Sequence, residues 1–157
     1  AMKIEIDQSI KIETTSKDSI LVFSNGISGS IRITAKSKRQ LQEKFRKIGE
    51  PRSFVLRIFT AGIALLVKPY LSKISEIVID KEYDGYEKII KELLVAFLKA
   101  EPKVRNGTLS ISFSNIGRKS NAHVIGYNIY IKKNKVDRTL AVNEITKICF
   151  EKTKNER

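Results

Sequence analysis

Hydrophobic and polar residues alternate over the first third of the chain. Five of the six even-numbered positions from Met2 to Ile12 are apolar, while charged residues occupy the odd positions 3, 5 and 7. This period of two predicts a strand with one buried face. A short apolar run, Ile20–Phe23, follows, and after a Gly-containing loop the alternation returns over Ile31–Ala35. The pattern predicts three consecutive antiparallel strands.

After Ala35 the apolar spacing becomes helical, interrupted by two short strands. Gly49 and Pro51 separate the first two helices, and Asp80 ends the fourth strand. The predicted helices are Lys36–Ile48, Arg52–Leu71, Tyr86–Ala100, Asn121–Ile131 and Thr139–Lys152, and the predicted strands are Ile77–Ile79 and Leu109–Phe113. The second helix is apolar nearly all round, as expected of a helix packed beneath a sheet.

The order of these elements is βββ, helices, β, α, β, α. Strands joined by a crossover helix pair in parallel, so the pattern predicts an α/β fold with one mixed sheet covered by helices. We expect a single domain over residues 2–151, because no linker or internal repeat interrupts it. Residues 152–157 form a charged tail that we expect to be frayed.

Charge is the strongest compositional signal. The 157 residues include 30 Lys or Arg and 17 Asp or Glu, for a formal charge of +13. Such an excess favours a polyanionic partner, with nucleic acid preferred over a membrane surface. One Cys and one His exclude a disulfide framework and a His-rich metal cluster. The lack of a signal-peptide pattern predicts a cytoplasmic protein, and the richness in Ile, Lys and Glu is typical of a thermophile.

Membrane insertion is not expected from the longest uncharged apolar stretch. That stretch, Ile58–Val67, has 10 residues between Arg57 and Lys68. A membrane-spanning helix needs about 20. We therefore predict a buried core helix and no membrane partner.

The element order and two acidic residues carry a resemblance to a known family. With Asp7 in the first strand (KIEID) and Asp80 ending the fourth (EIVID), residues from about Met2 to Ile131 resemble the ribonuclease H-like superfamily. The resemblance implies that these strands are parallel neighbours at the sheet centre. It also implies a metal-dependent nuclease that acts on RNA, DNA or a hybrid. His123, in SNAHVIGYNIY, looks like the last member of the Asp-Glu-Asp-His arrangement of Argonaute Piwi domains and some Holliday-junction resolvases.

Metal binding by the pair Asp7 and Asp80 is also expected on physical grounds. Two carboxylates that converge at one sheet edge repel each other unless a divalent cation lies between them. Mg²⁺ or Mn²⁺ suits this sparse site because Mg²⁺ keeps several waters and binds substrate phosphate oxygens. We predict Asp7, Asp80 and His123 as metal ligands, with the imidazole favouring Mn²⁺.

The family's helical Glu has no clear match. The helix from Arg52 to Leu71 contains no acidic residue. Glu50 lies just before it and is assigned as the fourth catalytic residue with Asp7, Asp80 and His123, while Glu43 is the alternative. If neither points into the site, the chain is a non-catalytic nucleic-acid-binding or assembly protein that kept the fold. The nature of the substrate and the oligomeric state stay open.

Basic residues provide the predicted nucleic-acid contacts. Glu43 is the only acid in the helix Lys36–Ile48, so the positive charges there are not explained by pairing along the helix. The alternative is a merely solvated helix face. We predict phosphate contacts by Lys36, Lys38, Arg39, Arg118, Lys119, Lys132 and Lys133.

Overall fold

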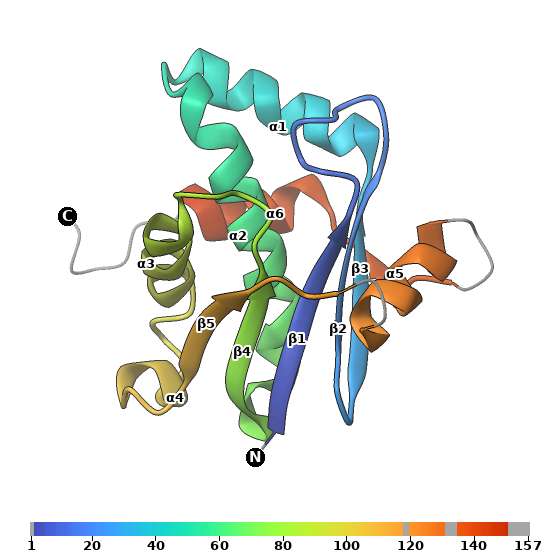
Figure 1. Cartoon of the computed structure of the whole chain (residues 1–157). Helices are drawn as coiled ribbons and strands as arrows, with labels where there is room; N and C mark the ends of the chain where they lie inside the picture. Colours follow the sequence, from blue (N-terminus) through green and yellow to red (C-terminus); the bar gives the residue numbers. More distant parts are fainter. Residues whose placement is uncertain (1, 118–119, 131–134, 151–157) are drawn as a thin grey trace.

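Six strands and the helices around them make up the part of the chain that the computed structural model describes, residues 2–117, 120–130 and 135–150 (Figure 1). The strands are β1 (Met2–Ser9), β2 (Ser19–Ser24), β3 (Ser28–Ile33), β4 (Ile74–Asp80), β5 (Ser110–Ser114) and β6 (Arg138–Thr139). The α-helices are α1 (Ala35–Lys47), α2 (Phe54–Val67), α3 (Glu87–Phe97), α4 (Pro102–Arg105), α5 (Asn121–Tyr130) and α6 (Val142–Phe150). Two 3-10 helices, η1 (Pro51–Ser53) and η2 (Lys68–Lys73), flank α2.

All six strands belong to one mixed sheet with the order β5-β4-β1-β2-β3-β6. Strands β1, β2 and β3 are antiparallel neighbours, while β4 runs parallel to β1 and β5 runs parallel to β4. The prediction of an α/β fold with a mixed sheet is confirmed, as is the parallel pairing of the first strand with the strand that ends at Asp80.

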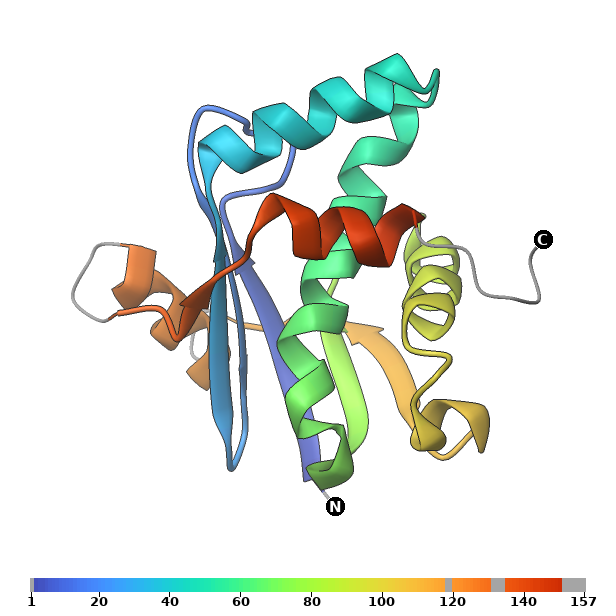
Figure 2. The same cartoon turned by 180° about the vertical axis from the view of Figure 1, so that it is seen from behind.

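Helices cover the two faces of the sheet unequally. Helix α2 crosses the back of the sheet, with α1, α3 and α6 around it, whereas α5 packs on the opposite face against β1 and β2 (Figure 2). The close approach of α2 depends on Gly62, because a Cβ there would lie 2.6 Å from Cδ1 of Leu21. The main core is therefore on the α2 side, and the α5 side holds a smaller cluster that includes Ile20, Val22 and Ile129.

Several element boundaries differ from the prediction. Strand β1 ends at Ser9, because Ile10 adopts the left-handed backbone conformation with φ 65°. Ile12 is nevertheless buried, although it lies in the loop and not in the strand. Its burial explains why it continues the pattern of apolar residues at even positions. The last helix begins only at Val142, since the preceding Arg138 and Thr139 pair with β3 as β6. The predicted tail, residues 152–157, lies outside the described residues.

The apolar segment around α2 behaves as a core element. Among the described residues, Pro51–Lys73 is long and apolar enough to span a bilayer by length and composition, and its most apolar window of 18 residues has a mean hydropathy of 1.6. Within the fold, 61% of the most apolar window of this segment is buried. Burial of this kind is expected of the central helix of a sheet-and-helix fold. The absence of a membrane partner stays a prediction.

Candidate metal centre

The pairing of β1 with β4 brings Asp7 and Asp80 together. Ile6 and Ile79 are register partners in this parallel pair, so the next residues, Asp7 and Asp80, lie side by side at the carboxyl ends of the strands. The isoleucines belong to the core on the α2 side. Since successive side chains point to opposite faces of a sheet, both aspartates point to the face that carries α5.

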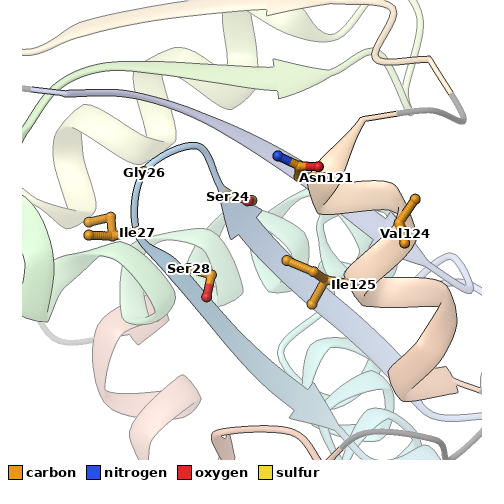
Figure 3. A pocket seen from close by; sticks show the side chains of 7 residues that line it. All are labelled: Ser24, Gly26, Ile27, Ser28, Asn121, Val124 and Ile125. Atoms are coloured by element: carbon orange, nitrogen blue, oxygen red, sulfur yellow. The ribbon is translucent and has the colours of Figure 1, made fainter.

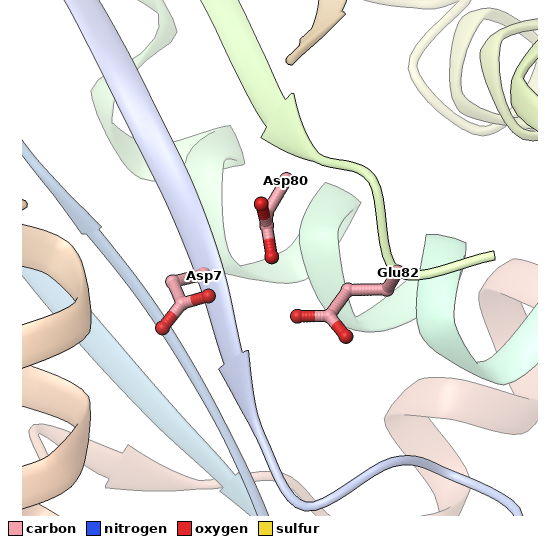
Figure 4. A group of neighbouring side chains, drawn as sticks. All are labelled: Asp7, Asp80 and Glu82. Atoms are coloured by element: carbon pink, nitrogen blue, oxygen red, sulfur yellow. The ribbon is translucent and has the colours of Figure 1, made fainter. Parts of the chain in front are cut away.

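Glu82 is the third carboxylate of the site. One carboxylate oxygen each from Asp7, Asp80 and Glu82 lies within 4.8 Å of the other two (Figure 4). The backbone turns immediately after β4, where the N–H of Glu82 donates to the carbonyl oxygen of Asp80 at 2.8 Å. The Ile116 N–H donates to Oδ1 of Asp80 at 2.7 Å, which fixes the orientation of that carboxylate.

Burial and mutual repulsion disfavour full ionisation of this group. Burial raises the pKa of Asp7, and the charge of Asp80 raises it further, although the hydrogen bond from His123 opposes both. The pKa of Glu82 is raised to about 8 by burial, by a hydrogen bond with Asp80 and by the charges of Asp80 and Asp7. A positive charge placed among the three would remove the cause of the repulsion.

The donor set fits a hard divalent cation. All three groups offer carboxylate oxygens, the ligands that Mg²⁺ and Mn²⁺ prefer. Only Asp7 is buried, whereas Asp80 and Glu82 are half-buried, so the site is partly open to solvent. These three residues would hold the ion.

His123 lies beside this group, in the first turn of α5. Its Nδ1 is 3.0 Å from Oδ2 of Asp7, and its backbone N–H donates to Oγ of Ser120 at 3.1 Å. Helix α5 packs closely on β1 at Gly126, where a Cβ would lie 3.1 Å from Oγ of Ser9. The structure thus places His123 in contact with Asp7, whereas the group whose ligand atoms lie within 4.8 Å of one another consists of Asp7, Asp80 and Glu82. Metal ligation by His123 stays a prediction.

Glu50 is not a member of the carboxylate group. It is exposed and lies in the turn between α1 and η1. Glu43, the alternative, is also exposed, on α1, 3.8 Å from the guanidinium of Arg46. The third carboxylate instead comes from the turn after β4. Its signal in the sequence was the pair of acids at positions 80 and 82, one ending a buried strand and the other in the turn that follows.

The predicted phosphate contact by Lys38 is wrong. Its side chain is 0% exposed, and its ammonium donates to the carbonyl oxygens of Thr14 at 2.7 Å and Lys11 at 3.3 Å and to Oγ of Ser19 at 2.8 Å. Burial lowers the pKa of Lys38 to about 8. This lysine anchors the loop between β1 and β2 and cannot reach a ligand.

Of the other predicted phosphate contacts, two lie in the described part of the chain. Lys36 and Arg39 are exposed on α1, and the Arg39 guanidinium donates to the carbonyl oxygen of Thr15 at 2.9 Å. Arg118, Lys119, Lys132 and Lys133 lie outside the described residues.

Two cavities lie away from the carboxylates. One, of about 290 Å³, separates α5 from the turn between β2 and β3 (Figure 3). The other, of about 600 Å³, lies among α2, α3 and α6 on the back of the molecule. Asp7, Asp80 and Glu82 line neither cavity. Neither cavity therefore belongs to the carboxylate group.

Comparisons were made with protein-family models, with curated proteins and with solved structures. No family model matches the chain, and neither the curated proteins nor the solved structures gave a significant match.

Proposed function

We propose that the chain is a metal-dependent nuclease of ribonuclease H-like fold. The observation that carries the proposal is the convergence of Asp7, Asp80 and Glu82 at the carboxyl ends of two adjacent parallel strands. In open sheets of this kind, ligands bind outside the carboxyl ends of the strands. An acidic site at that place, in a chain with a formal charge of +13, suits an ion that bridges the protein to an anionic substrate.

The strand arrangement supports the family assignment. The resemblance implies that the first and fourth strands are parallel neighbours, which is how β1 and β4 pair. A histidine on a late helix is also implied, and His123 occupies such a place on α5. Glu82 replaces the helical Glu of the family pattern, so the proposed site differs from that pattern in one carboxylate.

Each residue has a proposed role. Asp7, Asp80 and Glu82 hold Mg²⁺ or Mn²⁺, and Oδ1 of Asp80 is kept in place by the Ile116 N–H. A bound ion of this class supplies activation of a water and neutralisation of charge on the leaving oxygen of a phosphodiester. His123 orients Asp7 through the 3.0 Å contact of Nδ1 with Oδ2.

A second candidate is a non-catalytic nucleic-acid-binding protein of the same fold. It is favoured by one specific observation: the helix that carries the family's Glu has no acidic residue here, from Arg52 to Leu71. In that case the positive charge still provides phosphate binding, while the carboxylate group lacks the geometry for hydrolysis.

Cleavage assays separate the two. Labelled RNA, DNA, hybrid and junction substrates are incubated with the protein in Mg²⁺, in Mn²⁺ and in chelator. Asp80→Asn keeps the shape of the side chain but removes a negative charge, so we expect turnover to fall by orders of magnitude with nucleic-acid affinity unchanged or higher. Asp84→Asn, an exposed acid in the same turn, is the matched control and should keep full activity.

The outcomes are distinct. Activity that requires a metal, survives in the control and is lost in Asp80→Asn supports the nuclease. Equal activity of the wild type and Asp80→Asn would place the chemistry elsewhere. Binding without cleavage of any substrate would favour the second candidate.

A further inference from the structure

Helix α5 has an unusual composition for an exposed helix. Its ten residues, Asn121–Tyr130, include no Asp, Glu, Lys or Arg, although 30% of the chain is charged. The helix packs through Ala122, Gly126 and Ile129, which are buried. A solvated helix face normally carries charged side chains. The exposed side of α5 therefore suits a contact with something other than water.

Two tyrosines dominate this exposed side. Tyr127 is 55% exposed and Tyr130 is 39% exposed. They follow His123 at spacings of four and seven residues, so the three side chains form one stripe along the helix. We call Tyr127 and Tyr130 the tyrosine stripe.

The stripe leads away from the carboxylate group. It lies about 90° around the helix from the buried face, on the flank where His123 meets Asp7. At 1.5 Å per residue, it extends for about 10 Å beyond His123. Helix α5 packs against β1 and β2, and in Figure 1 it lies beside β2 and β3. A chain that binds at the carboxylates can thus continue along α5.

We infer that the tyrosine stripe is a stacking platform for unpaired bases, and that the substrate is a nucleic acid with a single-stranded segment beside the phosphodiester held at Asp7, Asp80 and Glu82. This inference rests on the proposed function. Exposed aromatic rings stack on bases of any sequence. Paired bases are closed to such contacts, so the platform selects for loops, ends or single strands. The lack of carboxylates on α5 removes a source of repulsion toward the phosphates.

Binding in chelator tests the inference without relying on catalysis. Fluorescence anisotropy compares a labelled single strand with a duplex of the same sequence, each as DNA and as RNA. We expect the double variant Tyr127→Ala, Tyr130→Ala to bind the single strand at least about tenfold more weakly, because each stacked ring contributes that order. Affinity for the duplex should be unchanged. The Tyr127→Phe, Tyr130→Phe pair keeps the rings and should bind the single strand as the wild type does.

Tyr86 provides a matched control. It is 50% exposed and precedes α3, which lies with α2 on the face of the sheet opposite α5. Tyr86→Ala should leave single-strand binding unchanged. Tyrosine fluorescence gives a second signal, since the chain has five Tyr and no Trp, and we expect it to be quenched by the single strand in the wild type but much less in the double alanine variant.

Three results would overturn the inference. Unchanged single-strand affinity in the double alanine variant would do so and, if metal-dependent and Asp80-dependent cleavage persists, would leave the proposed function intact. An equal loss for single strand and duplex would mean that the tyrosines do not select unpaired bases. If the wild type sediments as a dimer and the double alanine variant as a monomer, with affinity for nucleic acid unchanged, the stripe is a contact between copies. Failure of the wild type to bind any nucleic acid at low salt would contradict the proposed function itself.

Discussion

Replacing Glu82 by glutamine should stabilise the metal-free protein. The pKa of Glu82 is raised from 4.5 to about 8, first by burial and then by Asp80 and Asp7. The folded chain therefore keeps this proton up to about pH 8, whereas the unfolded chain releases it near pH 4.5. Since the folded state binds more protons in that window, the free energy of unfolding falls as the pH rises through it.

The size of the effect follows from the same values. A rise from 4.5 to about 8 corresponds to at most about 5 kcal/mol once the pH exceeds 8. Glu82 is half-buried and shares its repulsion with two other carboxylates, so solvent screening lowers our expectation to about 2 kcal/mol. Glu82→Gln keeps the shape and removes the titrating group, and the variant should be more stable than the wild type by this amount at pH 8 in chelator.

Denaturant unfolding at a series of pH values between 5 and 9 measures this difference. The wild type should lose stability as the pH rises relative to Glu82→Gln, and the two should be close at the acidic end. Added Mg²⁺ or Mn²⁺ should reverse the order at pH 8, because an ion that binds only the folded state stabilises the wild type more. Asp84→Asn, an exposed acid two residues away, should follow the wild type throughout.

Two results would refute this reasoning. If Glu82→Gln is no more stable than the wild type at pH 8 in chelator, the carboxylates do not repel each other as the geometry implies. If the metal stabilises both proteins equally, Glu82 is not a ligand.

Three further predictions concern other parts of the molecule. Lys38 has its pKa lowered to about 8 by burial. The unfolded chain therefore binds more protons above pH 8, and the free energy of unfolding should rise by about 1 kcal/mol per pH unit up to pH 10, a slope that Lys38→Met should remove in denaturant titrations. Gly62→Ala should destabilise the fold by about 1–2 kcal/mol, measured in the same way, because its Cβ would clash with Leu21 despite a better helix propensity. Duplex DNA binding should weaken with salt at a log–log slope of about -4 to -5, and replacing Lys36 and Arg39 by Ala should flatten it by up to about two; an unchanged slope would remove α1 from the interface.

Much of the fold could be predicted because an element with one buried face has apolar residues at regular spacings in the sequence. The alternation in β1 and the apolar run Ile77–Ile79 marked the two neighbouring strands of the site, and the parity within each strand determines the face on which Asp7 and Asp80 lie. Strand β6 has only two residues, Arg138 and Thr139, both exposed, so no period could reveal it. Its pairing with β3 depends on tertiary contacts alone.

The wrong assignment of Lys38 shows the limit of residue type as a guide. Leu41 and Phe45 follow Lys38 at spacings of three and seven residues, and these three are the buried residues of α1. The position of Lys38 on the apolar stripe thus indicated burial, whereas its charge indicated exposure. The position was the better guide. Three oxygen acceptors at the β1–β2 loop make the buried ammonium tolerable, and no sequence pattern encodes that loop.

Glu82 was not predicted from the sequence because the family pattern has its glutamate on a helix, whereas Glu82 lies in the turn after β4. Asp80 and Glu82 are separated by one residue, so a single turn after β4 positions both. Tyr83 ties this turn to β1 and to the loop that follows it. Its hydroxyl accepts from Nε2 of Gln8 in β1 at 3.4 Å and from the Ile12 N–H in the loop at 3.3 Å, and it donates to Oε1 of Glu13 at 3.2 Å. Its ring packs against Phe59 of α2, with ring centroids 4.9 Å apart. The turn that carries Glu82 is therefore held from both β1 and α2, which gives a loop carboxylate some of the rigidity that a helical one would have, and rigidity is what a metal ligand needs.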